Sequence, residues 1–180
     1  MITLGIETAT AVVSVALAGD QGVLGSIEIN QGRRHAEVVA PAIEFLCAHA
    51  QISVADIGTI GVDIGPGLFT GMRVGIATAK TMAQALQVPV VGVSSLDLLA
   101  HPLRRSPKVI ASVIDARKGE VFYAFYLAGD DAAVRVTDPC AGSLDDVDAA
   151  DVREITITSS DRRWDVRWDR LAEALQEWAS

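Results

Sequence analysis

Residues 4–20 have the sequence LGIETATAVVSVALAGD, and residues 113–130 repeat its outline as VIDARKGEVFYAFYLAGD. Each stretch joins two apolar, β-rich runs through a polar turn and ends in Ala-Gly-Asp, which predicts two strands of an antiparallel meander. A repeat on this scale indicates two related lobes. We therefore predict a first lobe over residues 1–102 and a second, shorter lobe over residues 103–180.

Strands and helices alternate along the chain in the pattern of an α/β fold. The predicted strands cover residues 2–7, 12–18, 23–29, 57–63, 88–93, 108–115, 120–127, 132–136 and 155–160. The predicted helices cover residues 37–50, 71–86, a short segment ending at 100, an acidic segment at 143–152 and a C-terminal segment. Pro41 fits the first helix only within its first turn, which places the helix start near Ala36. The C-terminal segment carries all three tryptophans, and its apolar residues form one helical face: Trp164, Trp168, Leu171, Leu175 and Trp178.

The composition excludes several classes of protein. A hydrophobic content of 50% can fill a core, whereas the net charge of −8 and the pI near 4.8 repel nucleic acid in the absence of a partner. Met1 leads directly into a predicted strand, and no apolar stretch is long enough to cross a bilayer, so we expect a cytoplasmic protein with no membrane association. Cys47 and Cys140 lie far apart, so we expect free thiols.

The glycine-rich stretch GPGLFTG, residues 65–71, follows a predicted strand and opens a predicted helix, which is a usual position for a phosphate-binding turn. It lacks the Walker ending and the dinucleotide-binding spacing, and Lys80 lies too far along the helix to reach an anion there. Small residues instead recur at every fourth position: Gly67, Gly71, Gly75, Ala79 and Ala83. Such a stripe admits a very close neighbour, either this chain's own sheet or first helix, or the helix of a partner.

Residues suited to catalysis are few. The histidines lack metal-centre spacing, and the sequence has no nucleophile elbow. We therefore expect no metal site, and surface or capping roles for the three histidines: His35, His49 and His101. The candidate nucleotide contacts are strand-end residues: Glu7, Thr8 and Asp115. Such carboxylates either hold magnesium or a phosphate-bound water, or they cap the turns that follow them.

Five stretches, in this order, resemble the TsaB (YeaZ) family: MITLGIETATAVVSVAL, RRHAEVVAPAIEFL, GPGLFTGMRVGIATAKTMAQAL, VVGVSSLDLLA and VIDARKGEVFYAFY. The resemblance covers about the first 125 residues, and the glycine-rich element joined to the DAR-GEV element is highly specific. It implies the duplicated actin/hexokinase-like (ASKHA, ribonuclease H-like) fold. Because the match fades after Asp138 and the closing PLYLR-like motif of the family is missing, it also implies a reduced second lobe.

The resemblance implies a noncatalytic scaffold subunit of the bacterial complex that forms N6-threonylcarbamoyladenosine in tRNA. Its partners would be a TsaD-like catalytic subunit, which carries the metal-binding histidines, and a TsaE-like ATPase, with tRNA bound only through the complex. Alone, the chain would form a homodimer through the same surface. The family's interface helices correspond here to His35, Glu37, Val38, Val39, Ala42, Leu46, Thr70, Gly71, Arg73, Val74, Gly75, Ala79, Lys80 and Ala83.

The resemblance implies no cofactor held by this subunit itself, and leaves open ATP and magnesium at the contact with the partner. Glu7 stands where the family usually has aspartate, and its longer side chain would enter a phosphate position. The alternative function is a small ATP-dependent phosphotransferase that uses Glu7, Asp115 and the turn at residues 65–71, because this fold also hosts kinases.

Overall fold

The computed structural model describes residues 1–30, 35–143, 146 and 155–159, and it divides the chain into two compact units. Unit 1 comprises Met1–Ser95 and unit 2 comprises Leu96–Ser180. The sequence placed the boundary after residue 102, so the structure differs by assigning the short helix before that position to unit 2. The reason is packing, since Leu96 and Ala100 of this helix lie in a core cluster with strand residues of unit 2.

A five-stranded mixed sheet forms the centre of unit 1. Its strands are β1 (Ile2–Glu7), β2 (Val13–Gly19), β3 (Gly22–Ile29), β4 (Ile57–Asp63) and β5 (Val90–Val93). Their order is β3-β2-β1-β4-β5, with an antiparallel meander followed by two strands that run parallel to β1. Because Ile6 pairs with Val62, the carboxyl ends of β1 and β4 lie next to each other.

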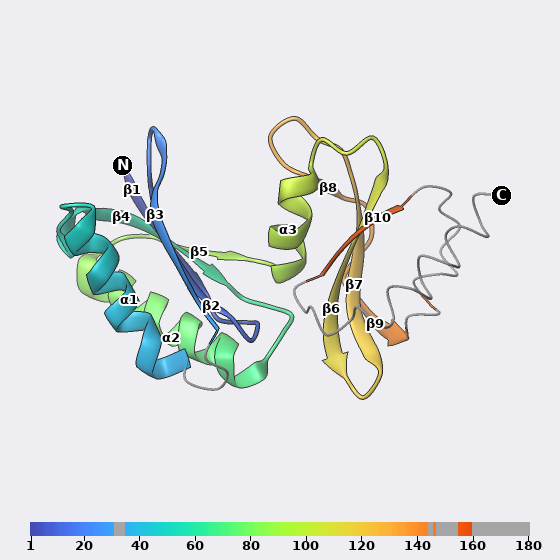
Figure 1. Ribbon diagram of the computed structural model, residues 1–180, viewed down its shortest axis with the longest axis horizontal. Coiled ribbons are helices and arrows are strands. Elements are labelled where there is room, and N and C mark those ends of the chain that lie inside the picture. The colour runs from blue at the N-terminus through green and yellow to red at the C-terminus, as the bar shows by residue number, and fades with distance from the viewer. Residues whose placement is uncertain (31–34, 144–145, 147–154, 160–180) are drawn as a thin grey trace. The chain divides into compact units, whose positions relative to one another are not determined.

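Two helices, α1 (His35–His49) and α2 (Phe69–Leu86), cover one face of this sheet (Figure 1). α1 packs against β2 and β3, α2 packs against β4, β1 and β5, and the helices contact each other. A short 3-10 helix, η1 (Val54–Asp56), leads into β4. Because alternate strand residues point to the helical side, Leu4 and Ile60 are fully buried between the sheet and the helices.

Pro41 lies inside α1, so the prediction that it occupies the first turn was wrong. The helix begins at His35, which places Pro41 in the second turn. A proline there removes a backbone donor from the helix interior, which is normally destabilising. The ring is exposed, whereas Val39, Ala42 and Ile43 of the same helix are buried, so tertiary packing of the apolar face outweighs the lost hydrogen bond.

The small-residue stripe of α2 faces this chain's own turn after β1. A Cβ atom added at Gly71 would overlap the Thr8 carbonyl, and one added at Gly75 would overlap the Thr8 hydroxyl. Further along the helix, the alanines of the stripe are buried in the core of unit 1: Ala79 and Ala83. The interpretation that a partner's helix lies on this stripe is therefore wrong, and the alternative of a close contact within the chain is correct.

Hydrogen bonds fix this close contact between the β1–β2 turn and α2. The Thr8 hydroxyl donates to the Gly71 carbonyl at 2.8 Å, and the Leu68 amide donates to the Ala9 carbonyl at 2.6 Å. A Cβ atom at Gly67 would overlap that same Ala9 carbonyl. The turn after β1 and the start of α2 therefore form one packed element with no room for side chains at the glycines.

Unit 2 is built on a second sheet, with α3 (Ser95–Ala100) packed against one of its faces. The described strands are β6 (Val109–Arg117), β7 (Glu120–Leu127), β8 (Val134–Arg135), β9 (Cys140–Ser143) and β10 (Ile155–Ser159). Their order is β10-β6-β7-β8, β9 also pairs with β7, and a 3-10 helix, η2 (His101–Leu103), follows α3. The sequence did not predict β9, because the residues CAGS show no apolar alternation.

The hairpin repeated from unit 1 is present in unit 2 as predicted. β6 and β7 are antiparallel, with Val113 opposite Tyr123, and the turn at residues 117–119 has positive φ throughout. β10 pairs with β6 in parallel, as β4 pairs with β1 in unit 1. The predicted acidic helix at 143–152 falls almost wholly, and the tryptophan-bearing segment wholly, outside the described residues.

A polar network ties α3 to the sheet of unit 2. The Tyr126 hydroxyl donates to Asp97 Oδ1 at 2.8 Å, and Arg135 donates to both carboxylate oxygens of Asp97 at 3.1 and 2.7 Å. The Ser112 hydroxyl donates to the Leu96 carbonyl at 2.8 Å. These bonds satisfy polar groups beside the apolar contacts of α3, so the helix is fixed by both kinds of interaction.

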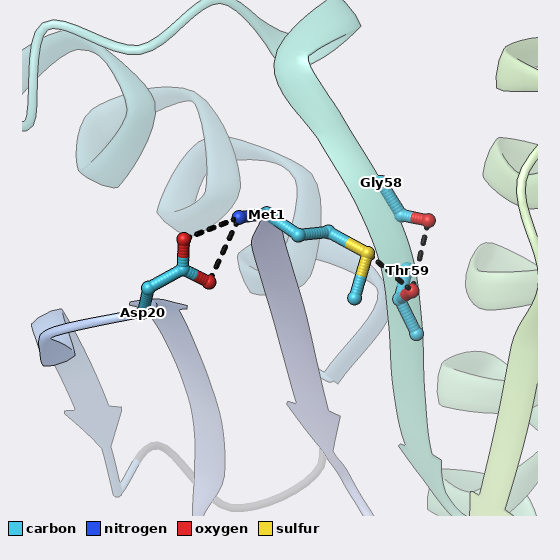
Figure 2. A network of polar contacts seen from close by, with 4 residues as sticks. All are labelled: Met1, Asp20, Gly58 and Thr59. Carbon is cyan, nitrogen blue, oxygen red and sulfur yellow. Dashed lines mark hydrogen bonds and ion pairs between the residues drawn. The ribbon is translucent and has the colours of Figure 1, made fainter.

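Polar contacts also join the start of β1 to its neighbours (Figure 2). The Met1 ammonium group donates to both carboxylate oxygens of Asp20, in the β2–β3 turn, at 2.9 and 3.1 Å. The Thr59 hydroxyl on β4 lies 2.8 Å from the Gly58 carbonyl and 3.7 Å from the Met1 sulfur. Exposed ion pairs contribute little stability, so the register of these strands depends on the core beneath them.

We predict that Gly71→Ala destabilises the protein, although glycine to alanine within a helix normally stabilises it by about 1 kcal/mol. The new methyl group would overlap the Thr8 backbone carbonyl, which cannot move without shifting β1. We expect a loss of about 1–3 kcal/mol in the free energy of unfolding, measured by urea denaturation. Gly5→Ala is the control, because its nearest contact would be at 3.9 Å; an equal loss in both variants would contradict this account.

Candidate functional site

Two acidic side chains end neighbouring parallel strands of unit 1: Glu7 ends β1 and Asp63 ends β4. Burial raises the pKa of Glu7 to about 7, with a further contribution from the negative charge of Asp63. Burial also raises the pKa of Asp63, which is only 2% exposed. Buried carboxylates with raised pKa values often mark functional sites, so this pair is the first candidate.

The Glu7 carboxylate is bound to its own turn. Its Oε1 atom accepts hydrogen bonds from the backbone amides of Ala9 and Thr10 at 2.6 and 3.0 Å, and its Oε2 atom accepts one from the Thr10 hydroxyl at 3.2 Å. A magnesium ion or a phosphate-bound water would have to replace these bonds. Of the two interpretations that the sequence left open for Glu7, the geometry therefore favours the turn cap.

Asp63 is a site residue that the sequence analysis missed. Its Oδ1 atom accepts from the Gly65 amide at 2.7 Å and from the Ser95 hydroxyl at 2.5 Å, and the Ser95 amide donates to the Gly65 carbonyl at 2.9 Å. Gly65 has φ of +93°, a conformation that favours glycine. Asp63 thus fixes the start of the glycine-rich turn. The sequence feature that could have identified it as a site residue is its position just before that turn.

The glycine-rich turn is filled by backbone carbonyl groups of the chain itself. Added Cβ atoms at Gly67 and Gly71 would meet the carbonyl oxygens of Ala9 and Thr8. A phosphate-binding turn presents amide groups to the ligand, whereas carbonyl oxygens repel an anion. The geometry of this turn is therefore that of a packing contact, and it offers little support for a phosphate site.

The predicted nucleotide contacts divide between the two units. Glu7 and Thr8 lie together at the end of β1, where Thr8 is fully buried, and Asp115 belongs to β6 of unit 2. Asp115 also caps its own turn, since its Oδ1 atom accepts from the Arg117 amide at 2.7 Å. Within the described residues, no group of three or more histidine, cysteine, aspartate or glutamate side chains could hold a metal ion.

His35 was expected at the surface or as a cap, and as an interface residue, but it is buried. Its Nε2 atom lies 2.9 Å from the Thr10 carbonyl, so the side chain joins the start of α1 to the turn after β1. His49 is exposed, as expected, and its ring stacks on that of Phe45 with the centroids 3.9 Å apart. The roles of these two histidines therefore differ, because only His35 lies on the side of α1 that faces the sheet.

The second candidate site is the exposed side of the two helices. Phe45 on α1 is 52% exposed and Phe69 on α2 is 63% exposed, and the Arg73 guanidinium group lies 3.8 Å from the centre of the Phe69 ring. The sequence analysis missed both phenylalanines as site residues, although Phe69 lies within the GPGLFTG stretch. We name the exposed residues of this side the outward face: Glu37, Phe45, Phe69, Thr70, Arg73 and Lys80.

The structure divides the predicted partner interface. Four of its members lie on the outward face: Glu37, Thr70, Arg73 and Lys80. Two are partly buried against the core: Val38 and Val74. The others are buried within unit 1, so their side chains are not exposed to a partner in this structure: His35, Val39, Ala42, Leu46, Gly71, Gly75, Ala79 and Ala83.

Comparisons with known proteins identify the family. The model of the family described as "TsaD: tRNA N6-adenosine threonylcarbamoyltransferase" matches residues 22–157. The "tRNA threonylcarbamoyladenosine biosynthesis protein TsaB" of Escherichia coli (strain K12) is 37% identical over 129 residues, which are 70% of this chain and 55% of that protein. A crystal structure from Pseudomonas aeruginosa, of an uncharacterized protein with similarity to peptidase YEAZ, has a TM-score of 0.74 at 30% identity, covering 79% of this chain and 66% of that chain. The chain belongs to the TsaB (YeaZ) family.

The comparisons also confirm the predicted fold class. The ethanolamine utilization protein EutJ from Carboxydothermus hydrogenoformans, at 10% identity, has a TM-score of 0.51 over 79% of this chain and 52% of that chain, and it shares the actin/hexokinase-like fold alone. The chain spans 40 to 66% of the length of the curated relatives that it matches. In the described ranges, no helix is long and apolar enough to cross a membrane.

We predict that Glu7 makes stability fall as the pH rises. Its pKa is about 7 in the folded protein against an ordinary value of 4.5, so the folded state favours the protonated side chain and loses that advantage between about pH 4.5 and 7. We measure the free energy of unfolding in urea at pH 5 and pH 8. Between these pH values, the free energy of unfolding of Glu7→Gln should rise by up to about 3 kcal/mol relative to that of the wild type.

The control for this measurement is Glu44→Gln, because Glu44 is exposed on α1. Glutamine keeps the Oε1 acceptor for the Ala9 and Thr10 amides, so the Glu7→Gln variant should fold. If the wild type and Glu7→Gln show the same change in stability between the two pH values, the described burial of Glu7 is not the state of the protein in solution.

Proposed function

We propose that this chain acts in the biosynthesis of threonylcarbamoyladenosine in tRNA, as a noncatalytic subunit that binds a TsaD-like catalytic partner through the outward face. The name of the Escherichia coli relative supports the pathway. The observation that carries the binding mode is the exposure of Phe69, with the Arg73 guanidinium group over its ring, at the start of α2. Aromatic and arginine side chains are the residues that most often dominate protein–protein binding energy.

The packing of α1 and α2 supports the choice of this surface. The inward sides of both helices are buried against the sheet, so only their outward sides remain for a partner. The outward face combines two large aromatic rings with charges of both signs, Glu37, Arg73 and Lys80, which suits a partly polar interface. In the absence of the partner, a second copy of this chain would bind the same surface and form a homodimer.

A noncatalytic role is supported by what the buried carboxylates already bind. Glu7 and Asp63 direct their oxygen atoms to backbone amides and hydroxyls of the chain itself, and the glycine-rich turn is packed against carbonyl groups. On this proposal the chain holds no cofactor of its own, ATP and magnesium are handled by a TsaE-like ATPase or at the contact with the partner, and the complex contacts tRNA in the cytoplasm.

Phe69→Asp should abolish most of the affinity for the TsaD-like protein of the same organism. A buried hot-spot aromatic residue contributes about 2 kcal/mol or more, so we expect the dissociation constant from calorimetry to rise by about 30-fold or more. Arg73→Glu should weaken binding as well, because it reverses the charge that lies over the ring. The unfolding free energy of both variants should stay close to that of the wild type, since both side chains are exposed.

The matched control is Val23→Asp, which also places an aspartate at an exposed apolar position, on β3 instead of the helices. It should bind the partner as the wild type does. Wild-type affinity of Phe69→Asp would overturn the proposed surface, and an equal loss in Val23→Asp would show that the effect is not specific to the outward face.

Calorimetry with Mg-ATP and the chain alone distinguishes the noncatalytic subunit from the alternative, an ATP-dependent phosphotransferase. We expect no binding in the micromolar range, because the turn that would hold the phosphates is filled by the Thr8 and Ala9 carbonyl groups. Micromolar binding that is lost in Glu7→Gln, together with ATP turnover in the absence of partners, would instead establish the enzyme.

A further inference from the structure

One turn, residues 8–10, contacts both helices of the outward face. α1 and α2 lie on the same side of the unit 1 sheet and contact each other (Figure 1). α2 is bound to the turn at two points, because the Thr8 hydroxyl donates to the Gly71 carbonyl at 2.8 Å and the Leu68 amide donates to the Ala9 carbonyl at 2.6 Å. Both bonds lie at the start of α2, so residues 8–10 fix the first turn of this helix.

The start of α2 has no side-chain cap of its own. Leu68 occupies the N-cap position, and its side chain makes no hydrogen bond to the helix amides. The first amides of a helix have no acceptor within the helix, so they need partners from elsewhere. The Ala9 carbonyl provides one such partner for the Leu68 amide. Because helix ends fray without such bonds, the first turn of α2 depends on the turn after β1.

His35 joins the first turn of α1 to the same turn. Its Nε2 atom lies 2.9 Å from the Thr10 carbonyl oxygen, and because a carbonyl only accepts, Nε2 carries the donated hydrogen. His35 is 6% exposed, and a Cβ atom added at Gly71 would lie 3.4 Å from its Cδ2 atom. The imidazole therefore lies between α1, residues 8–10 and α2, with its Nε2 hydrogen bond directed to the turn.

Glu7 fixes the shape of this turn. Its Oε1 atom accepts hydrogen bonds from the Ala9 and Thr10 amides, and its Oε2 atom accepts one from the Thr10 hydroxyl. Thr8, between them, is fully buried. The carbonyl groups of Ala9 and Thr10, which accept hydrogen bonds from the starts of α2 and α1, therefore belong to one segment of fixed geometry.

The outward face begins directly at these buried anchors. Phe69 and Arg73 flank Gly71 on α2, and Glu37 lies two residues after His35 on α1. The three flanking side chains are exposed, whereas Gly71 and His35 are buried. The spacing between the exposed side chains of the two helices is therefore set by contacts that a partner does not touch.

We propose that His35 and Thr8 are positioning residues for partner binding, which align the first turns of α1 and α2 through residues 8–10. This inference rests on the proposed binding of a partner through the outward face. A partner that contacts both helices binds one relative arrangement of them, so any free energy needed to restore that arrangement is lost from the affinity. A residue that only stabilises the fold would change the free energy of unfolding and leave the dissociation constant of the folded protein unchanged.

Two pairs of variants test this proposal by calorimetry with the TsaD-like protein of the same organism. His35→Ala removes the bond to the Thr10 carbonyl, and Thr8→Val removes the hydroxyl group at nearly constant shape. Each should raise the dissociation constant by about 3- to 10-fold, which is the range for one lost hydrogen bond. His35→Gln and Thr8→Ser keep a donor at each position, so they should bind as the wild type does.

Ile43→Val is the matched control for a loss of stability alone. Ile43 is buried in the core of unit 1, on α1, about two turns after His35. The variant should lower the free energy of unfolding, because a buried methyl group is lost, and it should leave the dissociation constant unchanged. Circular dichroism identifies any variant that fails to fold, and the other pair of variants then decides.

Hydrogen exchange of the Leu68 amide tests the coupling between the helices without a partner. This amide lies at the start of α2, whereas His35 belongs to α1, and residues 8–10 accept hydrogen bonds from both. We expect His35→Ala to speed the exchange of the Leu68 amide by about 3- to 10-fold. Ile43→Val should leave it unchanged, because amides at helix ends exchange through local opening.

The possible outcomes separate this inference from the proposed function. Wild-type affinity in His35→Ala and Thr8→Val, together with the expected loss in Phe69→Asp, would overturn the inference and leave the outward face in place. Failure of both His35→Gln and Thr8→Ser to restore affinity, or unchanged Leu68 exchange in folded His35→Ala, would also overturn it. Wild-type affinity in Phe69→Asp would instead overturn the proposed surface, and with it the role of His35 and Thr8 in binding.

Discussion

The close contact between the turn after β1 and the start of α2 is the constraint on which unit 1 depends. The Thr8 hydroxyl bonds to the Gly71 carbonyl, the Leu68 amide bonds to the Ala9 carbonyl, and the glycines of the stripe leave no gap beside them. Because backbone meets backbone here, neither side can adapt by moving a flexible side chain. The position of α2 over the sheet is therefore set by the path of the chain after β1.

This contact also explains the chemistry at the strand ends. The turn after β1 is compact because the Glu7 carboxylate binds its amides, and the same compactness buries that carboxylate and raises its pKa. Asp63 does the equivalent for the next turn, where it binds the Gly65 amide and the Ser95 hydroxyl. Burial at the ends of parallel strands raises both pKa values, whereas the hydrogen bonds from the turns lower them, so catalysis is not needed to account for the shifts.

The sequence predicted most of the fold, because alternation along the strands and the spacing of small residues in α2 are local patterns. The predicted first and last residues of β1, β4 and β7 are the observed ones. The prediction missed β9, because that strand is defined by its pairing with β7 in the folded chain. The stripe predicted which side of α2 has no bulky side chains, but a periodic pattern does not predict which segment packs against that side. Phe45 and Phe69 were missed as site residues for the same reason, since exposure is a property of the folded chain.

The small-residue stripe of α2 packs against the chain's own turn after β1, and this packing strengthens the argument that a partner binds the outward face. Gly71 and Gly75 alternate along α2 with Phe69 and Arg73, so residues that lock the helix to the sheet lie directly beneath residues that point away from it. A partner that binds Phe69 therefore meets a side chain on a helix that is already fixed, and little conformational entropy remains to be lost on association. If the outward face binds the proposed partner, the glycines contribute indirectly, because they make rigid the helix that carries Phe69.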